Sequence, residues 1–169
     1  MKRLLTVLLC LLAAGATASQ AAPPPKGIVT VRLSRSTAAL FPDHRYTFSA
    51  VLQSRREQAE LLSGLPLDTE DQAALAEVLA DCDYETSTAI LAFFREGASY
   101  HAEWYQLVEF AQWENSPNYR LILACVPPKS YGGSDQVLTA YCSVLLLPKT
   151  DLGEGSVTVH VRWREPASS

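Results

Sequence analysis

Histidine and glutamate are the side chains that suit acid–base chemistry near neutral pH, and this chain has three histidines. His44, His101 and His160 fall on three separate predicted segments, so their spacing brings no two of them together. His101 and Glu103 are predicted to share one face of a strand, where an exposed polar pair is the ordinary interpretation. No G-x-S-x-G motif supplies a nucleophile beside them. The sequence therefore favours a protein that is not an enzyme, with a small hydrolase or an enzyme inhibitor as the alternative.

Cysteine supplies the other reactive side chains. Beyond residue 21 the chain has Cys82, Cys125 and Cys142, with no CxxC spacing and no histidine near them, so neither a metal site nor a cofactor is predicted. If Gly133-Ser134 forms a two-residue turn, positions 125 and 142 face each other with Cα atoms about 4.5 Å apart, which a disulfide tolerates. We therefore predict a Cys125–Cys142 disulfide. Pairing of Cys82 with either partner stays open.

The first residues have the pattern of a secretory signal. Two basic residues precede an apolar run at positions 4–14, which is shorter than the about 20 residues that span a bilayer. Small residues follow as far as residue 21, in an arrangement that suits signal-peptidase cleavage. We therefore expect residues 1–21 to be a cleaved signal peptide. Residues 22–169 are then expected to form one soluble domain outside the cytoplasm, in the extracellular space or the periplasm.

The charge of the chain limits its partners. The formal net charge is −4 at pH 7, and loss of the two basic residues in 1–21 lowers it to −6. Nucleic acids and anionic membranes are bound mainly through Lys and Arg. The remaining basic residues are scattered, apart from Arg55-Arg56 and the pair Arg162 and Arg164, which we interpret as solvated charge on a helix start and a strand. The sequence argues against nucleic acid and membrane as partners.

Alternation of apolar and polar residues predicts a mainly β fold. Seven segments have the pattern of strands, at 27–35, 45–53, 87–97, 99–111, 119–127, 137–148 and 156–163. Between the second and third of them, Ser54 with Glu57 and Thr69 with Gln72 have the spacing of capping boxes. They predict two short helices within residues 55–81. We therefore expect a single antiparallel β-sandwich of about seven strands with an inserted short helical pair.

Aromatic residues concentrate between Phe93 and Trp113, where seven of the fifteen in the chain occur. This stretch fits a helix as well as a strand, and its aromatic content favours the strand. A strand over 99–111 would place Trp104 and Phe110 in the core. The same alternation would leave side chains on the opposite face, among them Tyr105 and Leu107.

Exposed aromatic side chains suggest protein binding, because Tyr and Trp carry much of the binding energy at protein interfaces. The predicted partner-binding residues are Tyr131 in the loop at 127–135, Trp113 in the loop at 112–118, Tyr105 and Leu107. We expect a secreted, non-catalytic module that binds a protein, which in a pathogen would suit a host-directed decoy or an immune-modulating protein. An envelope or assembly subunit, linked through an interchain disulfide, is a further alternative.

Overall fold

The computed structural model of this chain describes residues 27–34, 39–41, 46–128, 131, 137–149, 152 and 155–163. Four predictions concern residues outside these ranges: the signal peptide at 1–21, the turn that contains His44, the two-residue turn at 133–134 and the solvated charge of Arg164. Within the described ranges, no helix has both the length and the apolar character needed to cross a membrane.

The described strands form two sheets. The elements, in chain order, are β1 (Ile28–Arg32), β2 (Thr47–Leu52), α1 (Arg55–Gly64), α2 (Thr69–Ala80), β3 (Ser87–Gly97), the 3-10 helix η2 (Ala102–Trp104), β4 (Tyr105–Gln112), β5 (Tyr119–Cys125), β6 (Leu138–Pro148) and β7 (Val157–Trp163). Sheet A has the strand order β1-β6-β3-β2, and sheet B has the order β4-β5-β7. The mainly β fold and the inserted helical pair are confirmed. The strands are not all antiparallel as predicted, because β5 and β7 run parallel.

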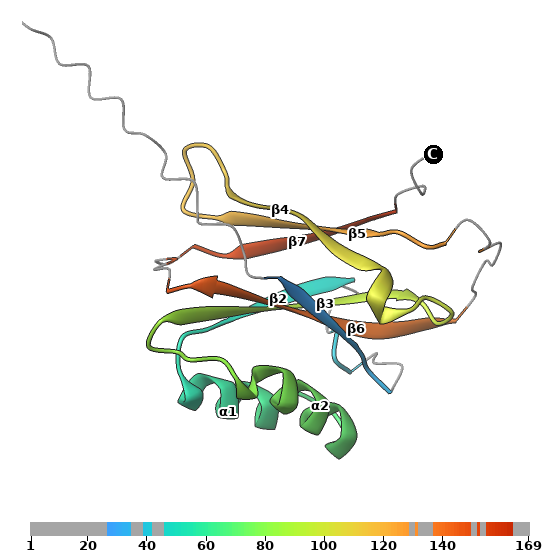
Figure 1. The fold of residues 1–169 in the computed structure, drawn as a ribbon, viewed down its shortest axis with the longest axis horizontal. Coiled ribbons are helices and arrows are strands. Elements are labelled where there is room, and N and C mark those ends of the chain that lie inside the picture. The colour runs from blue at the N-terminus through green and yellow to red at the C-terminus, as the bar shows by residue number, and fades with distance from the viewer. Residues whose placement is uncertain are drawn as a thin grey trace, which may run out of the picture.

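Sheet A is the middle layer of three. Figure 1 shows α1 and α2 against one side of it and sheet B on the other. Side chains along β3 and β6 alternate between the two sides. Phe93 and Cys142 pack in one core cluster with Leu75 of α2, whereas Phe94 and Tyr141 pack in a second cluster with sheet B. Because both faces of sheet A are covered, β3 and β6 are nearly continuous apolar runs in the sequence.

Both helices begin at side-chain caps. The Ser54 hydroxyl accepts a hydrogen bond from the backbone N–H of Glu57 at 3.2 Å, as the predicted capping spacing requires. The second cap is Asp68 rather than the predicted Thr69, and it accepts from the N–H of Asp71 at 2.9 Å. Thr69 is already the first helical residue, because the aspartate one position earlier is an equally good cap.

All three cysteines in the described part of the chain are free thiols. The predicted Cys125–Cys142 disulfide is wrong, because β5 and β6 belong to different sheets and do not form the hairpin that the prediction assumed. Cys142 faces the helices and Cys125 lies between the sheets, so sheet A separates them. Cys82, at the end of α2, belongs to the cluster on the helix side.

The aromatic stretch is a strand only from Tyr105 onward. The 3-10 helix Ala102–Trp104 precedes it, and a bulge shifts the pairing of β4 with β5 just after Leu107. The 3-10 helix changes the face that the residues directly after it occupy, and the bulge does so only for the residues after Leu107, compared with a strictly alternating strand. Tyr105 is therefore only 4% exposed and Leu107 packs against the core, where outward positions were predicted. Trp104 and Phe110 pack against the core as predicted.

Candidate functional site

Five ring-bearing side chains meet at one end of the two sheets, and we call them the aromatic cluster. They are Tyr100, His101, Trp104, Tyr131 and Trp163. The Trp104 ring centroid lies 5.1 Å from that of Tyr131 and 4.7 Å from that of His101. The Tyr100 centroid lies 5.2 Å from that of Trp163 and 5.6 Å from that of Tyr131. These separations are typical of favourable aromatic pairs, so the cluster is a packed group.

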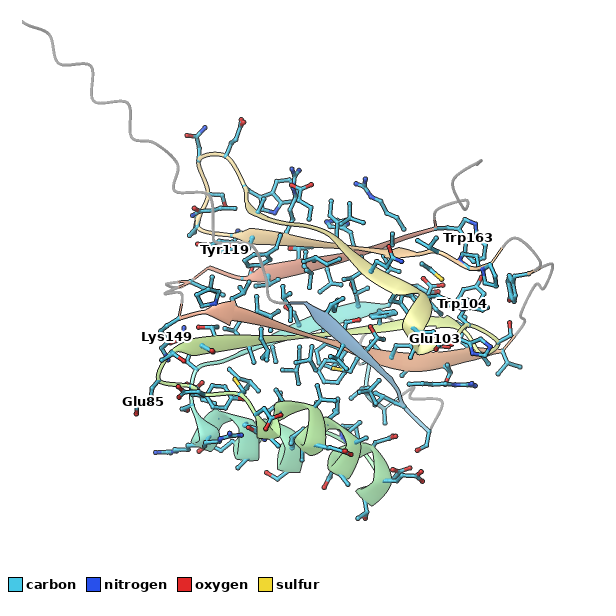
Figure 2. All side chains as sticks on the ribbon, viewed as in Figure 1. Glu85, Glu103, Trp104, Tyr119, Lys149 and Trp163 are labelled. Atoms are coloured by element: carbon cyan, nitrogen blue, oxygen red, sulfur yellow. The ribbon has the colours of Figure 1, made fainter. Side chains whose placement is uncertain are left out.

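The cluster is drawn from four places in the sequence. Tyr100 and His101 follow β3, Trp104 ends η2, Tyr131 lies between β5 and β6, and Trp163 ends β7. Figure 2 shows Trp104 and Trp163 together at one end of the molecule. The pairing of the strands, and no local motif, brings these rings into contact.

Hydrogen bonds fix the backbone under the cluster. The Tyr141 side chain is fully buried, and its hydroxyl donates to the Tyr100 carbonyl at 2.7 Å and lies 3.0 Å from the Gly97 carbonyl oxygen. The backbone N–H of Val126 donates to the Trp104 carbonyl at 2.9 Å. The rings are thus held in place before any ligand arrives, which lowers the entropy cost of binding.

Large apolar side chains are exposed at the same end. The exposed fractions are 66% for Tyr46, 65% for Val137, 41% for Leu138 and 50% for Trp163. Leu138 pairs with Gly97, the last residue of β3, and Tyr46 directly precedes β2 where it pairs with the end of β3. By alternation, Tyr46 and Leu138 share the helix-side face of sheet A with Phe48 and Ala140, so of the four exposed side chains only Trp163 belongs to the aromatic cluster.

Glu96 brings a carboxyl group to the space between the sheets at this end. By the alternation of β3 it shares the face of Phe94, whereas Arg95 faces the other way and lies over the Phe41 ring, 5.1 Å from its centroid. Burial raises the pKa of Glu96. Among the described residues, no Lys, Arg or His forms an ion pair with this carboxylate.

Two neutral groups face Glu96 from sheet B. Tyr105 and Cys125 are register partners on β4 and β5. Burial, and then the charge of Glu96, raises the pKa of the Cys125 thiol to about 11, so the thiol is protonated at neutral pH and is not a nucleophile. Burial is also the main cause that raises the pKa of Tyr105. The Tyr105 hydroxyl lies against this thiol and has no other hydrogen-bond partner within the described residues.

The burial of Glu96 predicts a pH-dependent stability. A carboxyl group with a raised pKa in the folded state costs stability when it ionises, so this cost develops as the pH rises above its ordinary value of 4.5. Tyr105 and Cys125 stay neutral through that range. Glu96→Gln should therefore raise the free energy of unfolding at pH 7, with the gain disappearing below pH 4.5. Urea unfolding at several pH values measures this, and the exposed Glu85→Gln is the control. An equal response of both variants would contradict the burial of Glu96.

The two predicted anchors, Tyr131 and Trp113, lie at opposite ends of sheet B. Trp113 follows β4 and is 45% exposed, with the Arg120 guanidinium 5.8 Å from its ring centroid. The eight residues of β4 separate it from the aromatic cluster, about 26 Å at a rise of 3.3 Å per residue. A compact contact surface would include one of these two residues and leave out the other.

Sequence reasoning identified Tyr131 but missed Tyr100, Trp163 and Glu96. Trp163 shares the inner face of β7 with Val159 and Val161, but it is the last residue of the strand and is half exposed. Glu96 likewise follows a long buried run near the end of β3. A large or charged residue at the end of a buried strand is the signal that could have found both.

The structure brings His101 and Glu103 together, as the sequence allowed. The Nδ1 atom of the imidazole lies 3.3 Å from Oε1 of the carboxylate, and the side chains are 60% and 71% exposed. His160 lies on the exposed face of β7. Across the described ranges, no group of three His, Cys, Asp or Glu side chains could hold a metal ion. The pair forms an exposed polar border of the aromatic cluster.

A cavity of about 560 Å³ lies at the other end of the molecule, lined by residues 53–55 and 80–85. Its basic neighbours already bind the protein's own carbonyl groups. Lys149 Nζ donates to the carbonyls of Gln53 at 3.0 Å and Tyr84 at 2.8 Å, and the Arg55 guanidinium donates to three carbonyls at the end of α2. These bonds join the helical pair to the neighbouring strands and satisfy the two basic side chains without a ligand.

Comparison of the chain with protein-family models, with curated proteins and with solved structures found no match. Function is therefore argued from the described residues. Among them, the aromatic cluster combines a half-exposed tryptophan with a backbone held by hydrogen bonds, at the end of the sheets where Glu96 lies without a cation among the described residues.

Proposed function

We propose that this protein is a secreted, non-catalytic binding module that recognises a protein partner through the aromatic cluster. The observation that carries the proposal is the meeting of five rings from four segments at one end of the two sheets, with Trp163 half exposed. Tyrosine and tryptophan are the residues that most often dominate binding energy at protein interfaces. The predicted signal peptide supports a partner outside the cytoplasm.

The rigid frame under the rings supports binding rather than a structural role alone. A purely structural cluster would bury its rings, whereas Trp163 keeps half of its surface in solvent. Tyr131 joins the cluster through the Trp104 and Tyr100 rings and through a hydrogen bond between its hydroxyl and that of Ser99. Such an anchored aromatic surface presents a large contact area at modest entropy cost.

The test compares two tryptophans of nearly equal exposure, Trp163 at 50% and Trp113 at 45%. Wild type, Trp163→Ala and Trp113→Ala are used side by side to capture extracellular proteins, and the affinity of a captured protein is then measured with purified components. Loss of an interface anchor typically costs about 2 kcal/mol, so Trp163→Ala should weaken binding about thirtyfold. Trp113→Ala should change it less than about threefold.

Circular dichroism and urea unfolding show whether the two variants are folded. If folded Trp163→Ala binds as tightly as wild type, the aromatic cluster is not the binding surface. If Trp113→Ala alone loses binding, the surface is at the β4–β5 hairpin instead.

A further inference from the structure

One half-buried carboxylate near the end of β3 has no cation beside it among the described residues. By the alternation of β3, Glu96 shares the face of Phe94, which meets sheet B, and its charge contributes to the raised pKa values of Tyr105 and Cys125. The neighbouring Arg95 lies over the Phe41 ring on the other face of sheet A. Placing a carboxylate in such a position is unfavourable unless something compensates its charge. The whole chain is also acidic, with a net charge of −4.

Aromatic side chains of sheet B face sheet A at the same end. The register of sheet B places Cys125 between Tyr105 on β4 and Trp163 on β7, with all three side chains on the face that meets sheet A. Glu96 faces sheet B from β3, and its charge contributes to the raised pKa values of the first two members of this row, Tyr105 and Cys125. Tyr100, which follows β3 by three residues, contacts Trp163 at 5.2 Å between ring centroids.

We propose that the surface formed by the half-buried Glu96 and the aromatic cluster binds an arginine or lysine side chain of the partner protein. The proposal rests on the proposed function and names the chemistry that the same surface recognises. A cation placed over Trp or Tyr rings is attracted by their electron-rich faces, and a partly desolvated carboxylate adds a direct charge partner. The exposed Glu103 carboxylate at the border of the cluster adds negative potential to this surface.

The three tryptophans provide a test that needs no identified partner. The full chain is titrated with N-acetyl-arginine methylamide and, separately, with its neutral analogue N-acetyl-citrulline methylamide, while the indole N–H signals are followed by NMR. Trp104 and Trp163 should shift in a saturable way with the arginine probe, and Trp113 at the far end should not. The citrulline probe should bind at least about tenfold more weakly, since it lacks the charge.

Two variants then test whether the Glu96 carboxylate binds the arginine probe. Glu96→Gln should weaken the arginine probe about tenfold, and Glu85→Gln, which changes an exposed carboxylate at the opposite end (Figure 2), should not. Equal shifts from the two probes, no shift from either, or full binding in Glu96→Gln would each overturn the inference. The proposed function has a separate test. If folded Trp163→Ala keeps partner binding, the aromatic cluster is not the binding surface. If that variant loses partner binding while Glu96→Gln keeps it, the proposed function is supported and the role of Glu96 is contradicted.

Discussion

Gly155→Ala is expected to lower the free energy of unfolding by about 3 kcal/mol, although it adds a single methyl group. A Cβ atom at residue 155 would overlap the backbone carbonyl oxygen of Pro117, and it would lie 2.8 Å from the Pro117 carbonyl carbon and 3.0 Å from the Leu152 oxygen. These are backbone atoms, so no side-chain rotation relieves the overlap. The β4–β5 hairpin would have to move away from the start of β7.

The contacts at risk join two segments that are far apart in the sequence. The backbone N–H of Tyr119 donates to the Ser156 carbonyl at 2.8 Å, and the N–H of Ser156 donates to Oδ1 of Asn118 at 3.0 Å. These bonds lead into the parallel pairing of β5 with β7, which begins at Tyr119 and Val157. Displacement at residue 155 should therefore weaken the edge strand that carries Trp163.

Gly64→Ala is the matched control. Gly64 ends α1, and a Cβ added there meets nothing within 4 Å. Alanine has the higher helix propensity, so this variant should be unchanged or up to about 1 kcal/mol more stable. Urea unfolding of both variants measures the difference. Equal stability of Gly155→Ala and wild type would mean that the hairpin does not approach residue 155 as closely as the structure shows.

Local patterns in the sequence predicted the elements well, because alternation and capping depend on neighbouring residues. The helical pair follows from Ser54 with Glu57, and the outer strands follow from their period of two. Local patterns do not predict which strands pair with each other. β5 and β6 are both apolar runs, and such runs carry little information about which partner they choose, so the predicted hairpin between them was wrong.

The candidate site was predicted only in part for the same reason. Tyr131 could be found as an aromatic residue in a Gly- and Ser-rich loop, but its neighbours Tyr100 and Trp163 reach it through sheet topology. Tyr105 was assigned to the wrong face because a period of two assumes an unbroken strand, and η2 breaks it directly before that residue. The sequence therefore did not predict the long-range pairing of the strands or the 3-10 helix that interrupts the alternation.

Arg55→Ala is expected to destabilise the protein by about 2–3 kcal/mol, far more than a surface arginine usually contributes. The sequence suggested that Arg55 carries solvated charge, and the structure corrects this. Its guanidinium donates to the carbonyls of Leu79 at 2.8 Å, Ala80 at 2.6 Å and Cys82 at 2.8 Å. It also lies 5.2 Å from the centroid of the Tyr84 ring. One side chain from the start of α1 therefore caps the end of α2.

The next residue provides the comparison. Arg56 pairs with Glu60 one turn along the same helix at 2.7 Å, and its side chain is 86% exposed. Pairs of this kind contribute about 0.3–0.5 kcal/mol, so Arg56→Ala should cost no more than that. Arg55→Lys separates charge from geometry: a lysine keeps the charge but has no planar fork to meet three carbonyls, so it should recover only part of the loss.

Urea unfolding of the three variants at one pH measures their free energies of unfolding. A carbonyl oxygen that loses its donor at the end of α2 can accept a hydrogen bond from water instead. The expected cost of Arg55→Ala is therefore lower than the sum of three charge-assisted hydrogen bonds. If Arg55→Ala and Arg56→Ala cost the same, the guanidinium does not cap α2 in solution. If Arg55→Lys matches wild type, the positive charge near the helix C-terminus is sufficient and the fork is not needed.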